Sequence, residues 1–358
     1  MQEEQGPVRA PEFPANVTWL QGGPFKLADL RGRPVLIDFW DYTCVNCLRT
    51  LPYVNEWHRR YGPLGLTVVG VHAPEFSFAR DAGNVQRSVR EQGIDYPVVL
   101  DNDYAIWQAY TNRYWPAKYL VDGHGYLRYY HHGEGAYAET EGAIQRLLKE
   151  SFPQILLPAL MDPVRAEDAT GALCYRVTPE LYLGYQRGLI GNVAGVIPDH
   201  PSTYRDPGKH LDGNAYLDGD WLLAGEYLAR PAGASGTSQL IVPYMAKEVN
   251  LVIHPPTYGG TATFSVQQDG AALAPEDAGA DVVAGDTVSL LSIDAPRLYR
   301  IVNNREIDRH ELTLTTTSDG VALYAFTFTS CLVPSEGGDS EPLADQSHPF
   351  PPREGAGD

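Results

Sequence analysis

Short apolar runs alternate with longer amphipathic segments over the first 150 residues of the chain. The apolar runs at residues 34–40, 66–72 and 96–100 have the length and composition of buried strands. Apolar positions at helical spacing follow these runs and predict helices over 44–61, 82–92, 103–110 and 138–149. Strands that alternate with helices are typical of an α/β domain.

Two more apolar runs belong to this first unit, at residues 115–121 and 125–131, and Asp122-Gly123 lies between them. An Asp-Gly turn matches the twist of two antiparallel strands, so these runs predict a β-hairpin and make the sheet a mixed one. Residues 25–33 predict a short strand and a turn that lead into the run at 34–40. Pro52 predicts a kink in the helix over 44–61.

The second half of the chain has a different pattern, in which β-rich segments follow one another without intervening helices. They lie at 173–177, 180–185, 220–228, 239–244, 248–254, 261–267, 287–293, 312–316 and 321–329. Short strands at this spacing predict an all-β jelly-roll or sandwich domain.

Changes in composition along the chain suggest the domain boundaries, and 358 residues suffice for two domains. We expect a loose N-terminal arm at 1–12, the α/β domain at 13–150, a proline-containing linker at 151–165, the β domain at 166–334 and a disordered acidic tail at 335–358.

The net charge of the chain is −18, which argues against a nucleic acid partner. No apolar run reaches the roughly 18 residues that span a bilayer, and the N-terminus lacks the basic and apolar regions of a signal peptide. Two interpretations follow: a cytosolic protein, or an extracytoplasmic one whose leader or membrane segment is absent from this chain. The family resemblance of the first domain favours the second.

Cys44 and Cys47 stand where the apolar run at 34–40 gives way to a helical pattern. A helix N-terminus presents unpaired amide donors and about half a positive charge, so it favours a thiolate over a thiol. We therefore expect a lowered pKa for Cys44, while Cys47 is placed to attack a mixed disulfide formed on Cys44. A structural disulfide or half of a zinc site is the alternative, but zinc needs further ligands and the chain has no second Cys-x-x-Cys.

Cys174 and Cys331 lie near the two ends of the β domain. They would form a disulfide if the first and last strands of that domain are neighbours, and two buried thiols are an equally good interpretation.

Residues 13–150 resemble a thioredoxin-fold domain of the TlpA-like branch, the thiol-disulfide oxidoreductases of the cell envelope. The resemblance rests on the strand around Asp38, the Cys44 and Cys47 pair, Pro52, and Pro116 before a strand. The segments 42–52, 71–76 and 133–135 are most like the soluble C-terminal region of DipZ proteins. The β half is similar to the carbohydrate-binding-module-like domain of those proteins, although such a resemblance does not establish sugar binding.

The resemblance implies roles for single residues. Asp38 would shuttle a proton to Cys47, and Pro116 would be a cis proline beside the cysteines. Expected substrate contacts come from Trp40, Thr43, Trp115 and Glu75. Thr43 replaces a tryptophan that commonly precedes the first cysteine, and Val45-Asn46 replaces the Gly-Pro of thioredoxin, so the redox potential does not carry over.

Copper binding and peroxidase chemistry are the rival hypotheses. The histidines and glutamates that would have to gather near the cysteines are His72, Glu75, His124, His131, His132 and Glu134. Copper chaperones of the Sco type, however, space their cysteines by three residues. A peroxiredoxin needs a threonine three residues before its reactive cysteine, where Asp41 stands here. We therefore predict no metal and no other cofactor.

The sequence thus predicts an extracytoplasmic thiol-disulfide oxidoreductase, a reductant in envelope protein or cytochrome c maturation. Its partners would be disulfide-containing proteins and a membrane electron donor of the CcdA or DsbD type. The alternative is a docking module in which the β domain binds a glycan or a protein and the redox pair is secondary.

Overall fold

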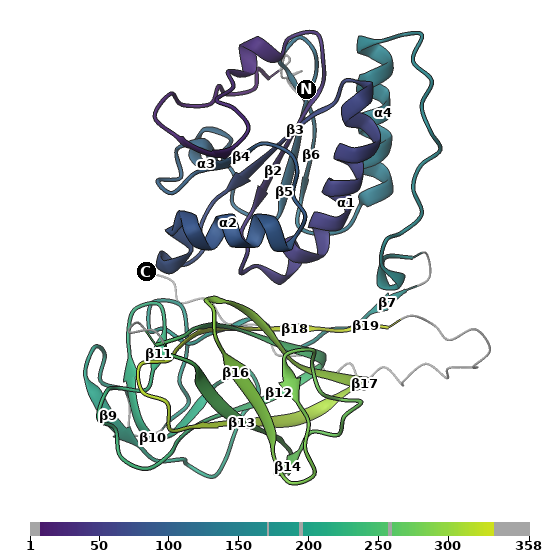
Figure 1. The fold of residues 1–358 in the computed structure, drawn as a ribbon. Coiled ribbons are helices and arrows are strands. Elements are labelled where there is room, and N and C mark those ends of the chain that lie inside the picture. The colour runs from purple at the N-terminus through teal and green to yellow at the C-terminus, as the bar shows by residue number, and fades with distance from the viewer. Residues whose placement is uncertain (1–7, 170–171, 193–195, 257–259, 333–358) are drawn as a thin grey trace, which may run out of the picture.

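A computed structural model describes residues 8–332 except 170–171, 193–195 and 257–259. Within these residues two sheets organise the chain, a six-stranded sheet in the first half and an 11-stranded sheet in the second. Figure 1 shows the first sheet with its helices above the second sheet. We call the two parts the redox unit and the β-unit.

The sheet of the redox unit has the strand order β1-β4-β3-β2-β5-β6. Its strands are β1 (Thr18–Gln21), β2 (Val35–Trp40), β3 (Thr67–His72), β4 (Val98–Leu100), β5 (Ala117–Val121) and β6 (Leu127–His132). The pairs β2–β3 and β3–β4 are parallel, whereas β1, β5 and β6 pair with their neighbours in antiparallel fashion. All six residues of the central strand β2 are buried, because helices cover both faces of the sheet.

The helices divide between the two faces of this sheet. They are α1 (Val45–Tyr61), α2 (Ala82–Glu91), α3 (Ala105–Ala109) and α4 (Tyr137–Ser151), with short 3-10 turns η1 (Leu27–Leu30), η2 (Gly62–Leu64), η3 (Ser77–Arg80) and η4 (Ala166–Asp168). Apolar side chains of α1, α2 and α4 share a core with Leu36 and Trp40 of β2. Those of α3 and η1 share the opposite core with Ile37 and Phe39. The predicted mixed α/β domain is confirmed.

Two predictions for the N-terminal part of this unit differ from the structure. Residues 27–30 form a 3-10 turn in place of the predicted strand, because the Glu12 carboxylate accepts the backbone N–H groups of Leu27 and Ala28 and holds them in a turn. The edge strand β1 lies earlier in the chain.

Residues 8–12 lie against the unit, where the Ala10 N–H donates to the Gly125 carbonyl at 3.0 Å. The rest of the expected arm, residues 1–7, lies outside the described residues.

The sheet of the β-unit is antiparallel. The named strands of this half are β7 (Leu173–Cys174), β8 (Leu181–Tyr182), β9 (Pro201–Tyr204), β10 (Tyr216–Leu223), β11 (Leu228–Ala229), β12 (Ser238–His254), β13 (Ala262–Gln268), β14 (Ala271–Ala272), β15 (Val282–Val283), β16 (Ser289–Ile293), β17 (Arg297–Thr316), β18 (Ala322–Thr329) and β19 (Cys331–Leu332). β7 and β19 form a separate pair. The predicted all-β second half is confirmed, but nothing supports the narrower terms jelly roll and carbohydrate-binding-module-like.

Two long strands form the centre of the β-unit. β12 has 17 residues and β17 has 20, and they pair with each other over most of their length. The sequence predicts two strands in place of β12, because register shifts between Ala246 and Glu248 and between Val249 and Asn250 interrupt the alternation. The sequence predicts only residues 312–316 of β17. The middle of this strand is polar and exposed, which separates its first residues from the predicted part.

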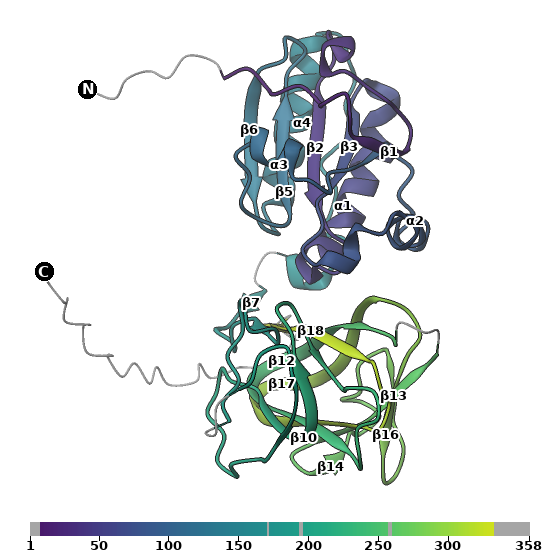
Figure 2. The same cartoon turned by 90° about the vertical axis from the view of Figure 1, so that its left-hand side faces the viewer.

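The connecting segment runs down one side of the redox unit from α4 to β7 (Figure 1), and the two units are packed end to end (Figure 2). Residues 152–165 run beside α1 and α4, where the backbone N–H of Val164 donates to Tyr53 Oη at 2.9 Å and that of Met161 to Glu141 Oε2 at 2.9 Å. An apolar cluster joins the units, and in it Phe76 packs with residues of the β-unit such as Val252 and Tyr324. The side chains of Cys174 and Cys331 and the predicted tail at 335–358 lie outside the described residues.

We predict that Phe76→Ala uncouples the two units, because Phe76 is 4 % exposed and fills the apolar cluster between them. Loss of a buried phenylalanine ring costs about 3 kcal/mol of unfolding free energy. Chemical denaturation followed by separate probes of each unit should therefore show transitions that lie further apart than in the unchanged protein.

The matched control is Phe13→Ala, because Phe13 is also 4 % exposed but lies in a core of the redox unit alone. Phe13→Ala should lower the stability of the redox unit through its own core. Equal separation of the two transitions in both variants would contradict the coupling role of Phe76.

Candidate active site

The two cysteines lie at the junction that the sequence predicts. β2 ends at Trp40, and α1 begins at Val45 with Cys44 as its N-cap residue. The Cys47 backbone N–H donates to Cys44 Sγ at 3.2 Å, so the second thiol lies directly beneath the first. Cys44 is partly exposed and Cys47 is buried, and both are free thiols. Only the first cysteine is therefore open to a partner.

The pKa of each thiol is raised. Burial raises the pKa of Cys44, hydrogen bonds with Cys47 lower it, and the charges of Glu75 and Asp41 raise it again. Burial is also the main cause that raises the pKa of Cys47. The pKa of Cys44 is thus raised, whereas the sequence predicts a lowered one. The prediction included the helix terminus and not the burial of the site or its two nearby carboxylates.

Asp38 is buried in the central strand of the sheet. It is 1 % exposed, and neither carboxylate oxygen accepts a hydrogen bond in the described part of the structure. Side chains alternate along a strand, so Asp38 faces the same side as Leu36 and Trp40, the side that α1 and Cys47 cover. Burial raises the pKa of Asp38 to about 7, although the positive charge of Lys118 opposes the rise.

The segment before β5 has the expected cis peptide bond between Trp115 and Pro116. The indole N–H of Trp115 donates to the carbonyl of Ala73 at 2.9 Å, and its ring packs on Trp107 at 4.2 Å between centroids. Trp115 is partly exposed and packs on the same apolar cluster as Cys44. Trp40, in contrast, is fully buried, so in this arrangement it is a core residue beneath the site and not a surface for a substrate.

Asp41 connects the two loops beside Cys44, a role that sequence reasoning missed. Its Oδ1 accepts the N–H of Thr43 at 2.9 Å and the Thr43 hydroxyl at 3.1 Å, and its Oδ2 accepts the N–H of Glu75. Both Asp41 and Thr43 are buried, so Thr43 braces this loop and its side chain faces away from solvent. His72 of β3 lies next to this loop, with Nε2 at 3.7 Å from Asp41 Oδ1 and its ring stacked on Tyr42.

Glu75 connects the redox unit to the β-unit. Its Oε1 accepts hydrogen bonds from the hydroxyl of Tyr182 at 2.8 Å and from Arg187 at 2.9 Å. Tyr182 also lies 2.6 Å from the carboxylate of Glu180. Burial and the nearby charges of Glu180 and Asp41 raise the pKa of Glu75 to about 7. No sequence motif predicts these contacts, because they join segments that lie far apart in the chain.

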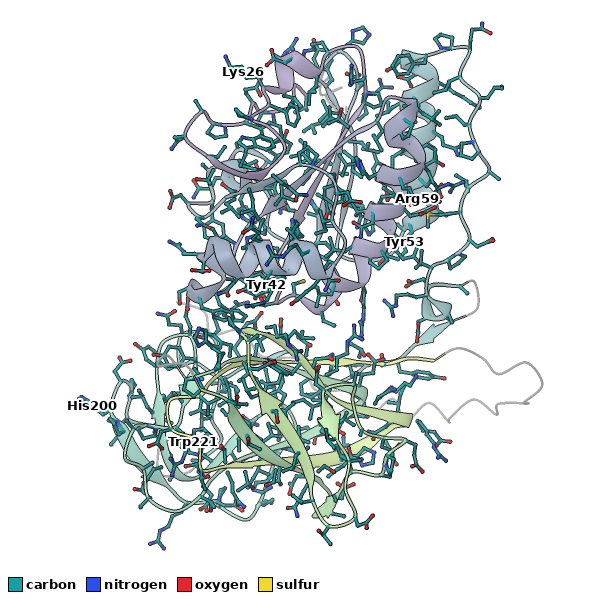
Figure 3. The ribbon with its side chains drawn as sticks, viewed as in Figure 1. Lys26, Tyr42, Tyr53, Arg59, His200 and Trp221 are labelled. Carbon is teal, nitrogen blue, oxygen red and sulfur yellow. The ribbon has the colours of Figure 1, made fainter. Side chains whose placement is uncertain are left out.

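The β-unit also lies against the cysteine motif itself. Val45, which stands between the two cysteines, and Leu48 pack on the apolar cluster that joins the units. Arg49 donates to Glu248 of β12 at 2.9 Å. A cleft of about 300 Å³ runs between α1 and the β-unit beside these residues. In Figure 3, Tyr42 lies at the end of the redox unit that faces the β-unit.

The side chains weighed for a metal site do not gather at the cysteines. Among the residues that the structure describes, no group of three or more His, Cys, Asp or Glu side chains is placed to hold a metal ion. His131 Nε2 instead bonds to the Glu134 carbonyl at 3.1 Å, and His132 packs on Tyr130 and Tyr114. In the same part of the chain, no helix is long and apolar enough to cross a membrane.

Comparison with known proteins agrees with this geometry. A model of the AhpC/TSA family matches residues 8–130, and a model described as a thioredoxin-like C-terminal domain matches residues 178–329. The thiol-disulfide oxidoreductase YkuV of Bacillus subtilis is 33% identical over 141 residues, which are 39% of this chain and 95% of YkuV. The chain belongs to the thioredoxin-like thiol-disulfide oxidoreductases.

Two further relatives of this oxidoreductase match different shares of the chain. The thiol-disulfide oxidoreductase ResA of Bacillus thuringiensis is 30% identical over 38% of this chain and 76% of its own length. Protein DipZ of Mycobacterium bovis is 37% identical over 264 residues, which are 73% of this chain. The chain spans only 36% of the length of that protein. The predicted resemblance to the TlpA-like and DipZ proteins is confirmed.

We predict that Asp38→Asn stabilises the protein in neutral and alkaline solution and not in acid. The folded protein keeps the Asp38 proton up to a pKa of about 7, whereas the unfolded chain releases it near 3.8. Folding stability therefore falls as the pH rises between these two values. The stability gained by Asp38→Asn should grow across this window to on the order of 4 kcal/mol above pH 7.

Urea denaturation of both proteins at pH 4, 5.5 and 8 measures this difference. A difference in unfolding free energy that is the same at all three pH values would show that Asp38 is not a buried titrating carboxyl.

Proposed function

We propose that this oxidoreductase reduces disulfide bonds in extracytoplasmic proteins and that Cys44 is its nucleophile. The observation that carries the proposal is the pairing of a partly exposed Cys44 thiol with a buried Cys47, whose N–H donates to Cys44 Sγ at 3.2 Å. Only Cys44 is placed to meet a partner disulfide. Because Cys47 is buried, thiols of other molecules do not reach it. Cys44 Sγ, the atom that Cys47 has to attack, lies next to it.

The exchange takes place in two steps. The Cys44 thiolate attacks one sulfur of the partner disulfide, forms a mixed disulfide and releases the other partner sulfur as a thiolate, which takes up a proton. Cys47 then passes its proton to the Asp38 carboxylate, and its sulfur attacks Cys44 Sγ. The Cys44–Cys47 disulfide forms and the second partner sulfur leaves as a thiolate, which is protonated in turn. The partner gains two electrons and the oxidoreductase loses two.

The raised pKa values of the two thiols support the reducing direction. A disulfide exchange protein is a strong oxidant when its reduced form is stabilised as a thiolate. Here burial works against the thiolate and so against the reduced form. The pair should therefore give up electrons readily and remain stable as a disulfide.

Several narrower assignments belong to this proposal. We assign the substrate-facing positions to Trp115 and Glu75, which are partly exposed, and we assign Pro116 to the active site as its cis proline. The physiological role would be in envelope protein or cytochrome c maturation, with electrons from a membrane donor of the CcdA or DsbD type. The extracytoplasmic location rests on the resemblance to the TlpA-like branch. The division of the chain at 151–165 and a glycan or protein ligand of the β-unit remain separate proposals.

We predict that Cys44→Ser abolishes reduction of insulin disulfides, because the serine hydroxyl does not replace a thiolate nucleophile. Cys47→Ser should still form the first bond and accumulate a mixed disulfide with insulin, visible by mass spectrometry. Full activity of Cys44→Ser would contradict the assignment. Accumulation of the mixed disulfide on Cys44→Ser in place of Cys47→Ser would reverse the two roles.

We also predict a reduction potential near the −270 mV of thioredoxin for the Cys44 and Cys47 pair. Equilibration with glutathione or dithiothreitol buffers, followed by alkylation of free thiols, measures it. A value less negative than about −180 mV, which is typical of protein disulfide isomerase, would contradict the reducing direction.

A further inference from the structure

Lys118 is a lysine in the interior of the redox unit, behind the two cysteines. It lies in β5, directly opposite Asp38 of β2 in the antiparallel register, and its side chain is fully buried. Lysine is almost never fully buried unless its charge is compensated. All five residues of β5 are buried, so the chain keeps a lysine at this position against the cost of removing its amine from water.

The Lys118 ammonium group lies on the same side of the sheet as the resolving cysteine. Residues that face each other across an antiparallel pair point to the same face, so Lys118 and Asp38 share the face that α1 and α4 cover. Lys118 Nζ donates to the Gly133 carbonyl at 3.2 Å and lies 5.7 Å from the centre of the Tyr137 ring. Neither contact compensates a full positive charge.

The charged and titratable groups around Lys118 come from every element packed against it. Burial lowers the pKa of Lys118, and the charges of Asp38 of β2, Cys47 of α1 and Glu134 of the loop after β6 oppose that shift. Tyr137 of α4 presents its ring. Asp38 in turn acts on the phenol of Tyr96. Asp38 and Cys47 are thus the two acids of the proposed resolving step, and Lys118 is the cation that acts on both.

We propose that Lys118 is a positioning residue that keeps the Asp38 carboxylate and the Cys47 thiolate available at neutral pH by supplying a buried positive charge. The proposal rests on the proposed function. Lys118 transfers no proton in it. The Cys47 proton moves to Asp38, and Lys118 stays an ammonium group throughout.

Distance does not remove this effect. No ion pair within 4.0 Å joins Lys118 and Asp38 in the described residues. In a dry interior, however, a charge acts over a longer range than in water, because the surrounding medium screens it weakly. The position beside Asp38 on the other neighbouring strand, β3, is Gly70, which carries no side chain. The counter-charge at this level of the sheet therefore comes from β5.

The test is a double-mutant cycle read by titration. Unfolding free energy is measured from pH 5 to 10 for the oxidised forms of the unchanged protein, Lys118→Met, Asp38→Asn and the double variant. In each background, the difference between the protein that keeps Asp38 and the one that carries Asp38→Asn gives the titration of Asp38. In the Lys118→Met background its midpoint should rise by about one pH unit. An unchanged midpoint would overturn the proposal.

The rate of insulin reduction gives a second measurement with the same proteins. Lys118→Met should lower the rate at pH 7, and the rate should recover as the pH rises, because Asp38 then regains its charge. If Lys118→Met lowered the rate by the same factor at every pH, or by the same factor when Asp38→Asn is also present, the role of Lys118 would be merely structural. Lys149→Met is the matched control, since Lys149 lies exposed on α4 and its loss should leave both profiles unchanged.

A measurement on the unchanged protein covers the case in which Lys118→Met does not fold. Nitrogen-15 and carbon-13 NMR follow the Lys118 amine and the Asp38 carboxyl through the same pH range. Lys118 should be charged at pH 7 and should shift when Asp38 titrates, and a neutral Lys118 at pH 7 would overturn the proposal. The titrations need no enzymatic activity, so an unchanged protein that fails to reduce insulin would contradict the proposed function and leave the charge pairing intact.

Discussion

Burial of an ionisable carboxyl in the central strand is the constraint on which the site depends. β2 is covered on both faces, and such a strand is normally apolar throughout. Asp38 breaks that rule without a hydrogen-bond partner for either oxygen in the described residues. Because desolvation moves its pKa to about 7, the side chain can lose or gain a proton near neutral pH. The fold accepts a less stable sheet and, in the proposed mechanism, gains a proton acceptor for Cys47.

The same burial acts on the sulfur atoms. Cys47 shares the apolar core of α1 and α4, and Cys44 lies at its edge with Val45 and Leu48 packed toward the β-unit. Enclosure raises the pKa values of both thiols and so outweighs the helix terminus, which would lower them. The proposed reducing direction and the presence of the β-unit are therefore connected, because a second unit that covers the motif helps to keep it buried.

Sequence reasoning predicted what depends on local pattern. The buried strands, the helices after them and the Cys44 and Cys47 junction follow from periodicity, and the cis bond at Pro116 followed from family resemblance. Lys118 was missed because its importance depends on the register of β5 against β2, which no local pattern determines. Asp41 was missed for a related reason, since its contact with Glu75 joins two loops that meet only in the fold.

The contact between the units carries a constraint of its own. The hydroxyl of Tyr182 lies 2.8 Å from Glu75 and 2.6 Å from Glu180, but a hydroxyl has one proton to donate. Both hydrogen bonds exist together only when one of the two carboxyl groups is itself protonated and donates to the tyrosine oxygen. A pKa of about 7 for Glu75 is consistent with that shared proton. The contact of Tyr182 with the two glutamates is therefore strongest when Glu75 and Glu180 share one proton and carry one negative charge between them. Arg187 offsets part of that charge.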